Sequence, residues 1–152
     1  MHTDFNKYAA KGNEVLHLLA DELHLTRKEA LRILRAVLHT IRAHVSVEES
    51  LQIIAQLPVA LKGLYVDQWK LTTNVWRTRH VHQFMEEVRQ HDGVAATRDF
   101  GLEDKTEQTV IAVFSALSYY LSEGELHDML AAFPGEIRTF IQNGLERNHI
   151  VF

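Results

Sequence analysis

The 152-residue chain contains no cysteine, only two prolines and only seven glycines. Without cysteine it can form no disulfide framework, thiol nucleophile, zinc ribbon or iron–sulfur cluster. The few glycines and prolines argue against an all-β barrel or sandwich, because such folds need turns about every ten residues. Uninterrupted runs of about 18 apolar residues are also absent, so we expect no membrane-spanning helix.

Charge of one sign is not in large excess, since 16 basic and 20 acidic residues leave a net charge of −4. This balance gives no general affinity for nucleic acid or for anionic lipid. The first residues contain no apolar segment of the kind found in signal peptides. We therefore expect a cytoplasmic protein with no membrane partner.

The residues that are present indicate one globular domain. Apolar residues make up 46% of the chain and charged residues 24%, which is close to the average for globular domains. Residues 27–45 show the strongest pattern, with apolar side chains at spacings of three and four that predict an amphipathic helix. Its apolar positions are Ala30, Leu31, Leu34, Val37, Leu38, Ile41 and Val45.

Capping residues and prolines recur at an interval of 76 residues. Thr26 and Glu29 form a capping box at the start of the first helix described above, and Ser46 and Glu49 form a second one. Pro58 follows at the first turn of a further short helix. Adding 76 leads from Ser46 to Ser122, from Glu49 to Glu125 and from Pro58 to Pro134.

We therefore predict an all-α fold, a compact helical bundle of two pseudo-symmetric repeats of about four helices each. The alternative is a bundle without a repeat, in which the second proline falls in register by accident. Residues 91–101, which contain Asp-Gly and a polar stretch, are expected to be a loop inserted in the second half. The predicted parts of this single domain (1–152) are repeat one (about 4–65), a linker (about 66–79), repeat two (about 80–145) and a C-terminal tail (146–152).

Three stretches of the sequence carry a resemblance to a known family. They are residues 34–39 with 45–49, residues 55–58 with 61–70, and residues 77–84. The chain resembles the bacterial DUF2267 family, a domain of unknown function, from about Tyr8 to Phe140. The resemblance implies an all-helical fold with two related halves and implies no catalytic residues. Members of the family usually have aspartate where this chain has His82, so no role of that carboxylate is transferred.

Ten histidines make metal binding the first chemistry to consider. No two of them are three or four residues apart, which is the spacing that a metal pair on one helix requires. If a helix begins near Val81, then His82 and Glu86 share a face and His80 lies beside them. These three side chains are candidate metal ligands. The alternative is that they are solvated or capping residues, and since the cluster matches no known ligand motif, we predict no resident cofactor.

The linker combines basic and aromatic residues. This pattern suits an anion or a single-stranded nucleic acid, with cations for phosphate and rings for stacking. The alternative is that the tryptophans wedge the linker onto the body while the arginines pair with acidic helix faces. The candidate residues for a ligand or partner are Trp69, Lys70, Trp76, Arg77, Arg79 and His80.

No nucleophile elbow and no glycine-rich phosphate loop is present, so we name no catalytic residues and do not favour an enzyme. A repeat of helices forms grooves, and grooves bind amphipathic helices or apolar ligands. The apolar tail at residues 148–152 is expected to pack on the body or on a partner. We therefore predict a non-enzymatic helical interaction or regulatory module that binds a protein partner or itself.

Overall fold

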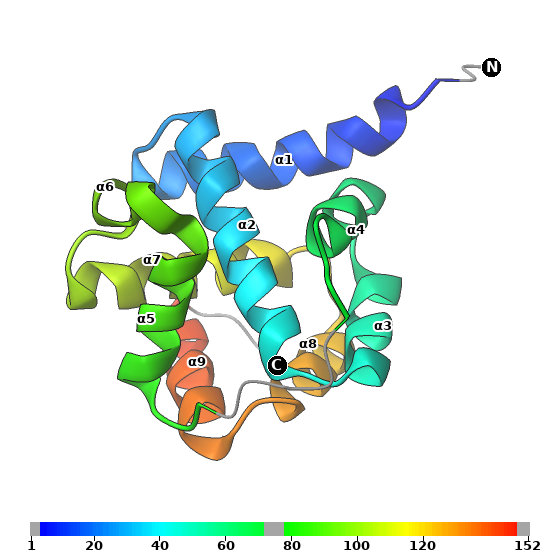
Figure 1. Cartoon of the computed structure of the whole chain (residues 1–152). Helices are drawn as coiled ribbons and strands as arrows, with labels where there is room; N and C mark the ends of the chain where they lie inside the picture. The colour runs from blue at the N-terminus through cyan, green and yellow to red at the C-terminus, as the bar shows by residue number, and fades with distance from the viewer. Residues whose placement is uncertain (1–3, 72–77, 149–152) are drawn as a thin grey trace.

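The computed structural model describes residues 4–71 and 78–148, and every regular element within them is a helix. The prediction of an all-α fold is therefore confirmed. No helix in these two ranges combines the length and the apolar character needed to cross a bilayer. The helices, shown in Figure 1, are α1 (Asn6–Leu23), α2 (Arg27–His44), α3 (Val47–Gln56), α4 (Val59–Val66), α5 (Val81–Asp92), the 3₁₀ helix η1 (Gly93–Ala95), α6 (Ala96–Phe100), α7 (Glu103–Ser118), α8 (Glu123–Ala131) and α9 (Gly135–Arg147).

Three helices begin at the side-chain caps that the sequence predicts. At the start of α2, Thr26 Oγ1 accepts the Glu29 amide at 3.1 Å, and the Thr26 amide donates to the Glu29 carboxylate at 3.2 Å. Ser46 and Glu49 make the same two bonds before α3. Before α8, Ser122 Oγ accepts the amide three residues further on. Because the first amides of a helix have no partner within it, these bonds fix where each helix begins.

Helix starts in the two halves of the chain agree in register. Helix α2 begins at Arg27 and α7 at Glu103. The same comparison gives Val47 and Glu123 for α3 and α8, and Val59 and Gly135 for α4 and α9. Each pair is 76 residues apart. Pro58 and Pro134 precede α4 and α9 with nearly equal φ angles of −55° and −54°. The predicted repeat requires this agreement, while the pseudo-twofold relation between the halves stays a prediction.

The opening helix of each half packs on a long helix of the other half. Helix α1 contacts α7 as well as α2 and α4, and α5 contacts α2. Helix α2 is enclosed by α1, α4, α5, α6 and α7, and ten of its 18 residues are buried. The apolar core consequently runs through both halves.

The expected loop at residues 91–101 is mostly helical, so that prediction is wrong. Helix α5 continues to Asp92 and is followed by η1 and α6. Phe100 and Asp99 are fully buried. Arg32 of α2 donates two hydrogen bonds to Asp99, at 2.9 and 2.8 Å. Because a buried carboxylate is stable only with a close charged or hydrogen-bonded partner, this pair holds α6 against α2.

Asp92 lies beside this ion pair at the end of α5. Burial and then the hydrogen bond to Asp99 raise the pKa of Asp92 to about 7. Burial alone would raise the pKa of Asp99, but the hydrogen bonds from Arg32 and Asp92 hold it below its usual value. Below neutral pH, Asp92 therefore keeps a proton that it donates to the ionised Asp99.

We expect Gly144→Ala to lower the free energy of unfolding by about 1–3 kcal/mol, because an added Cβ overpacks the contact between α9 and α7. That Cβ would lie 2.4 Å from Cδ1 of Ile111. The control is Gly124→Ala in α8, where a Cβ would meet nothing within 4 Å. Alanine has the higher helix propensity, so the control should unfold at the same or a slightly higher urea concentration. Equal loss of stability in both variants would contradict the packing argument.

We expect Asp92→Asn to stabilise the protein at pH 7 and above, because the amide donates to Asp99 as the protonated carboxyl does. The pKa of Asp92 is about 7 in the folded chain against 3.8 as its ordinary value. Its stabilising contribution is therefore complete below pH 3.8 and is lost as the pH rises to about 7. The melting temperature of the variant, relative to the natural protein, should rise between these pH values and level off above them. A difference that is independent of pH would show that Asp92 does not titrate in this way.

Candidate functional site

Of the predicted ligand or partner residues, Trp69 and Lys70 precede residues 72–77, and Arg79 and His80 follow them. Trp76 and Arg77 fall outside the described residues. The half-buried ring of Trp69 packs edge-on against Tyr65, with ring centroids 6.0 Å apart, and the Arg42 guanidinium lies 6.0 Å from the Trp69 ring. This position fits the alternative in which a tryptophan holds the linker on the body.

Two arginines of α2 hold the chain where it leaves α4. Arg42 Nη1 donates to the carbonyls of Tyr65 and Asp67, both at 2.7 Å. Arg35 Nη2 lies 2.9 Å from Asp67 Oδ2. The last carbonyls of a helix have no hydrogen-bond donor within the helix, and here the Arg42 guanidinium is that donor. Lys70, one of the predicted contact residues, is exposed beyond this anchored stretch.

The N-terminus of α5 is capped by a side chain of α9. Glu136 accepts the Val81 amide at 3.1 Å, and its second oxygen lies 3.0 Å from His80 Nδ1. The hydrogen bonds from the Val81 amide and from His80 lower the pKa of Glu136. The rings of His80 and His82 stack at 5.9 Å, and Arg79 is exposed. His80 thus takes part in a cap.

The predicted metal ligands His80, His82 and Glu86 are all exposed. In the described part of the chain, no three His, Asp or Glu side chains gather closely enough to hold a metal ion. Glu86 lies instead 3.9 Å from Arg89 Nε. The metal site stays a prediction, without an observed cluster in its support.

A buried polar network lies between α2 and α5. His44 Nε2 is 2.6 Å from Glu87 Oε2, and His44 Nδ1 is 2.9 Å from the Thr40 carbonyl. The two side chains are 1% and 15% exposed. Because a carbonyl can only accept, Nδ1 carries a hydrogen. Thr78 donates to the other oxygen of Glu87 and so ties the end of the linker to this network.

Two further histidines form hydrogen bonds at the surfaces of α2, His91 from α5 and His39 from α2 itself. His91 Nδ1 lies 2.9 Å from Thr40 Oγ1, which itself donates to the Ala36 carbonyl at 2.8 Å. His39 Nε2 lies 2.9 Å from the Leu64 carbonyl. Burial lowers the pKa of His39 to about 4 and also lowers that of His91. Both rings are therefore neutral at pH 7 and act as packed hydrogen-bonding groups.

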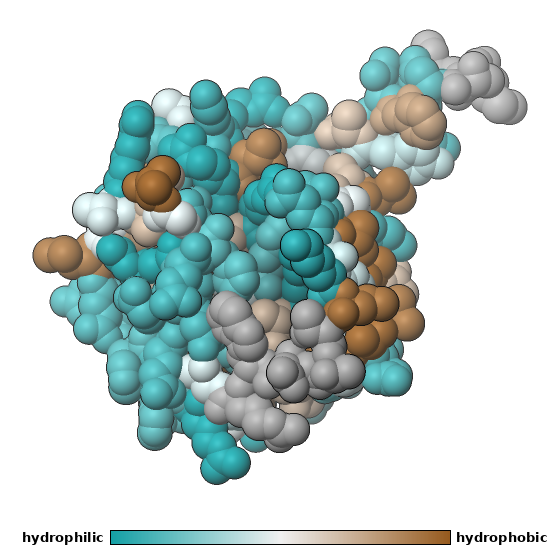
Figure 2. Space-filling view, viewed as in Figure 1, coloured by the Kyte–Doolittle hydropathy of each residue, from teal (hydrophilic) through white to brown (hydrophobic). Residues whose placement is uncertain are grey.

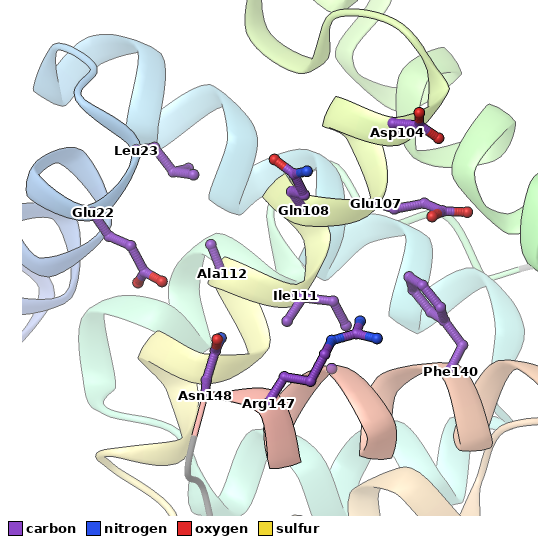
Figure 3. A pocket seen from close by; sticks show the side chains of 11 residues that line it. Glu22, Leu23, Asp104, Glu107, Gln108, Ile111, Ala112, Phe140, Arg147 and Asn148 are labelled. Atoms are coloured by element: carbon purple, nitrogen blue, oxygen red, sulfur yellow. The ribbon is translucent and has the colours of Figure 1, made fainter.

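A cavity of about 490 Å³ lies between α1, α7 and α9, as Figure 3 shows. Its floor is apolar, and its rim carries charges of both signs. Burial raises the pKa of Glu22 on α1. Burial, and then the neighbouring Glu103 and Asp104, raise the pKa of Glu107 on α7. The lining residues are Glu22, Leu23, Asp104, Glu107, Gln108, Ile111, Ala112, Phe140, Gly144, Arg147 and Asn148.

A groove of about 420 Å³ lies between α1, α2 and α4 and is lined mainly by small and apolar residues. At its base α1 approaches α4 closely, since a Cβ on Gly12 would lie 2.7 Å from Cβ of Ala60. The lining residues are Ala9, Gly12, Asn13, Leu16, Leu31, Leu34, Ala60, Leu61, Gly63, Leu64 and Asp67.

Local spacing could not have revealed the buried network or the cavity, because their members come from helices far apart in the sequence. The 76-residue offset is the one signal that relates the two hollows. Glu107 and Phe140 line the cavity, and Leu31 and Leu64, 76 positions earlier, line the groove. At these two equivalent positions the first half has two leucines, whereas the second half has a glutamate and a phenylalanine.

We expect Glu87→Ala to lower the free energy of unfolding by about 3 kcal/mol, because it leaves the buried His44 ring without its carboxylate partner. The neighbouring Glu86 side chain is 64% exposed and provides the matched control. Glu86→Ala should change stability by no more than about 0.5 kcal/mol. Chemical unfolding followed by circular dichroism measures both, and similar values would show that the buried pair contributes nothing special.

The comparisons with known proteins identify a family. No curated protein matches the chain. The model of the family described as an uncharacterized conserved protein, DUF2267, matches residues 12–140, which is most of the sequence. The match includes all three stretches on which the resemblance rests. The chain therefore belongs to the DUF2267 family of uncharacterized conserved proteins.

Proposed function

We propose that this protein is a non-enzymatic helical interaction or regulatory module that associates with a second copy of itself through α1. The observation that carries the proposal is the beginning of α1. Every residue from 4 to 11 is exposed, and this part of the helix projects beyond the rest of the molecule (Figure 1). The cytoplasm as its location is part of the proposal and depends on the sequence alone.

The core-facing stripe of α1 continues into the projecting part. Tyr8 lies two turns before the buried Val15 and shares its face of the helix, and Phe5 is the N-cap residue directly before α1. Phe5 is 82% exposed and Tyr8 36% exposed. Two aromatic rings at the beginning of an uncovered helix are typical of a contact surface.

The groove between α1, α2 and α4 adjoins this projecting part and complements it in shape. Small residues in the groove, such as Ala9, Gly12 and Gly63, leave room for large side chains, and the projecting helix supplies two rings. Figure 2 shows apolar residues gathered on the same side, over α3 and α4. The exposed apolar residues of these two helices include Val47, Leu51 and Val59.

A twofold arrangement brings the rings and the groove together. Ala9 of the projecting part lines the groove beside the buried Gly12, so a twofold axis near these residues places each copy's α1 in the groove of the other. Such an interface is self-complementary and closes at a dimer. Charge supports it, because Lys7 and Lys11 are exposed on the projecting helix while Asp67 lies at the groove's edge, 49% exposed.

We also propose that the chain is one domain of two related halves, with the repeats and linker bounded as the sequence predicts. The equal offset of three helix starts supports this proposal. The packing supports it as well, because α1 lies on α7 and α5 lies on α2. A pseudo-twofold axis between the halves relates these two contacts to each other.

We expect the natural protein to form a dimer with a micromolar dissociation constant and Phe5→Asp to weaken it at least tenfold, or by about 1.4 kcal/mol. A buried carboxylate in the groove would have no partner. Sedimentation velocity over a range of concentrations measures both. Leu102→Asp is the matched control, since Leu102 is also 82% exposed and α7 begins on the side away from the projecting helix (Figure 1).

The control should dimerise like the natural protein. A natural protein that stays monomeric at millimolar concentration would refute self-association, and equal weakening by both substitutions would refute the assignment to α1.

A further inference from the structure

We propose that the cavity between α1, α7 and α9 binds a small zwitterion, with the ligand's ammonium group at Glu22 and its carboxylate at Arg147. The ligand class is an amino acid whose two charged groups are joined by a short apolar chain. This site lies at the C-terminal end of α1, the end opposite the projecting residues. It is therefore independent of the proposed self-association.

The cavity has the size of a small-molecule site. Its volume of about 490 Å³ lies within the range of about 300–1,000 Å³ that is typical of ligand pockets. Figure 3 shows Glu22 on one side of the floor formed by Ile111 and Ala112, and Arg147 with Phe140 on the other. A ligand that spans this floor meets an acidic group at one end and a basic group at the other.

Both charged groups are available to a ligand. Among the residues that the structure describes, Glu22 and Arg147 form no side-chain hydrogen bond or ion pair, although Arg147 lies close enough to Glu107 to lower the pKa of that carboxyl group. Glu22 is an exposed residue, and partial burial of its carboxyl group raises its pKa. An ammonium group placed there compensates for the lost solvation.

The remaining lining residues determine which of the two contacts with the ligand is the stronger one. Burial and the acidic neighbours Glu103 and Asp104 raise the pKa of Glu107. Arg147 lowers this pKa, but its effect is smaller than theirs. Negative charge is therefore in excess around the cavity, and the ammonium contact at Glu22 is the stronger one. Consequently, a ligand with only a carboxylate is repelled, and one with only an ammonium group loses the contact with Arg147.

Three probes with the same six-carbon chain test this assignment on the full-length protein: 6-aminohexanoate, hexylamine and hexanoate. Isothermal titration calorimetry should show the tightest binding for 6-aminohexanoate, weaker binding for hexylamine and none for hexanoate. Glu22→Gln should weaken the binding of 6-aminohexanoate and hexylamine at least tenfold. Arg147→Gln should remove the preference for 6-aminohexanoate over hexylamine.

Asp21→Asn is the matched control, because Asp21 is an exposed acidic residue beside Glu22 that does not line the cavity. It should leave all three affinities unchanged, and circular dichroism should show that every variant is folded. Equal binding of hexylamine and 6-aminohexanoate to the natural protein would overturn the zwitterion assignment. Equal effects of Asp21→Asn and Glu22→Gln, or no binding of any probe at millimolar concentration, would overturn the site itself.

Discussion

The burial of α2 on almost every side is the constraint on which the rest of the structure depends. A helix in contact with five others must give each of its buried polar groups a partner. Thr40, His39 and His44 are such groups, and each hydrogen-bonds a carbonyl of the protein. Partners for this helix come from both halves of the chain, so burying α2 brings the halves together.

The charged residues of α2 extend this role from the core to the surface. Arg32 holds α6 through Asp99, and Arg42 binds the carbonyls at the end of α4. Each arginine keeps its charge near water while its hydrogen bonds reach a partner at least 23 residues away. Helix α2 thus orders both the apolar interior and the segments that cover it.

The two proposed functions depend on α1. At one end of α1 an apolar stripe continues beyond the body, and at the other end Glu22 faces the charged cavity.

Much of the fold could be predicted because its signals are local. The capping bonds of Thr26 and Ser46 join residues three apart, and proline restricts the backbone at its own position. The expected loop at residues 91–101 failed for the opposite reason. Asp-Gly and polar residues are typical of a turn, but here Asp99 pairs with Arg32, which is 67 residues away, and Phe100 enters the core. The candidate site residues stay a prediction, and the positions of Trp69 on Tyr65 and of His80 in a cap fit the alternatives that the sequence also offers.

The sequence by itself determined that the chain is helical, where several helices begin, and to which family it belongs. These properties depend on contacts within a turn or two of helix and on the order of residues along the chain. Only the tertiary structure decided that His44 meets Glu87, that Glu22 and Arg147 line one cavity, and that the beginning of α1 stays uncovered. The physical reason is that such contacts depend on how helices cross. Those crossings result from the packing of many side chains at once, and no spacing along the chain records them.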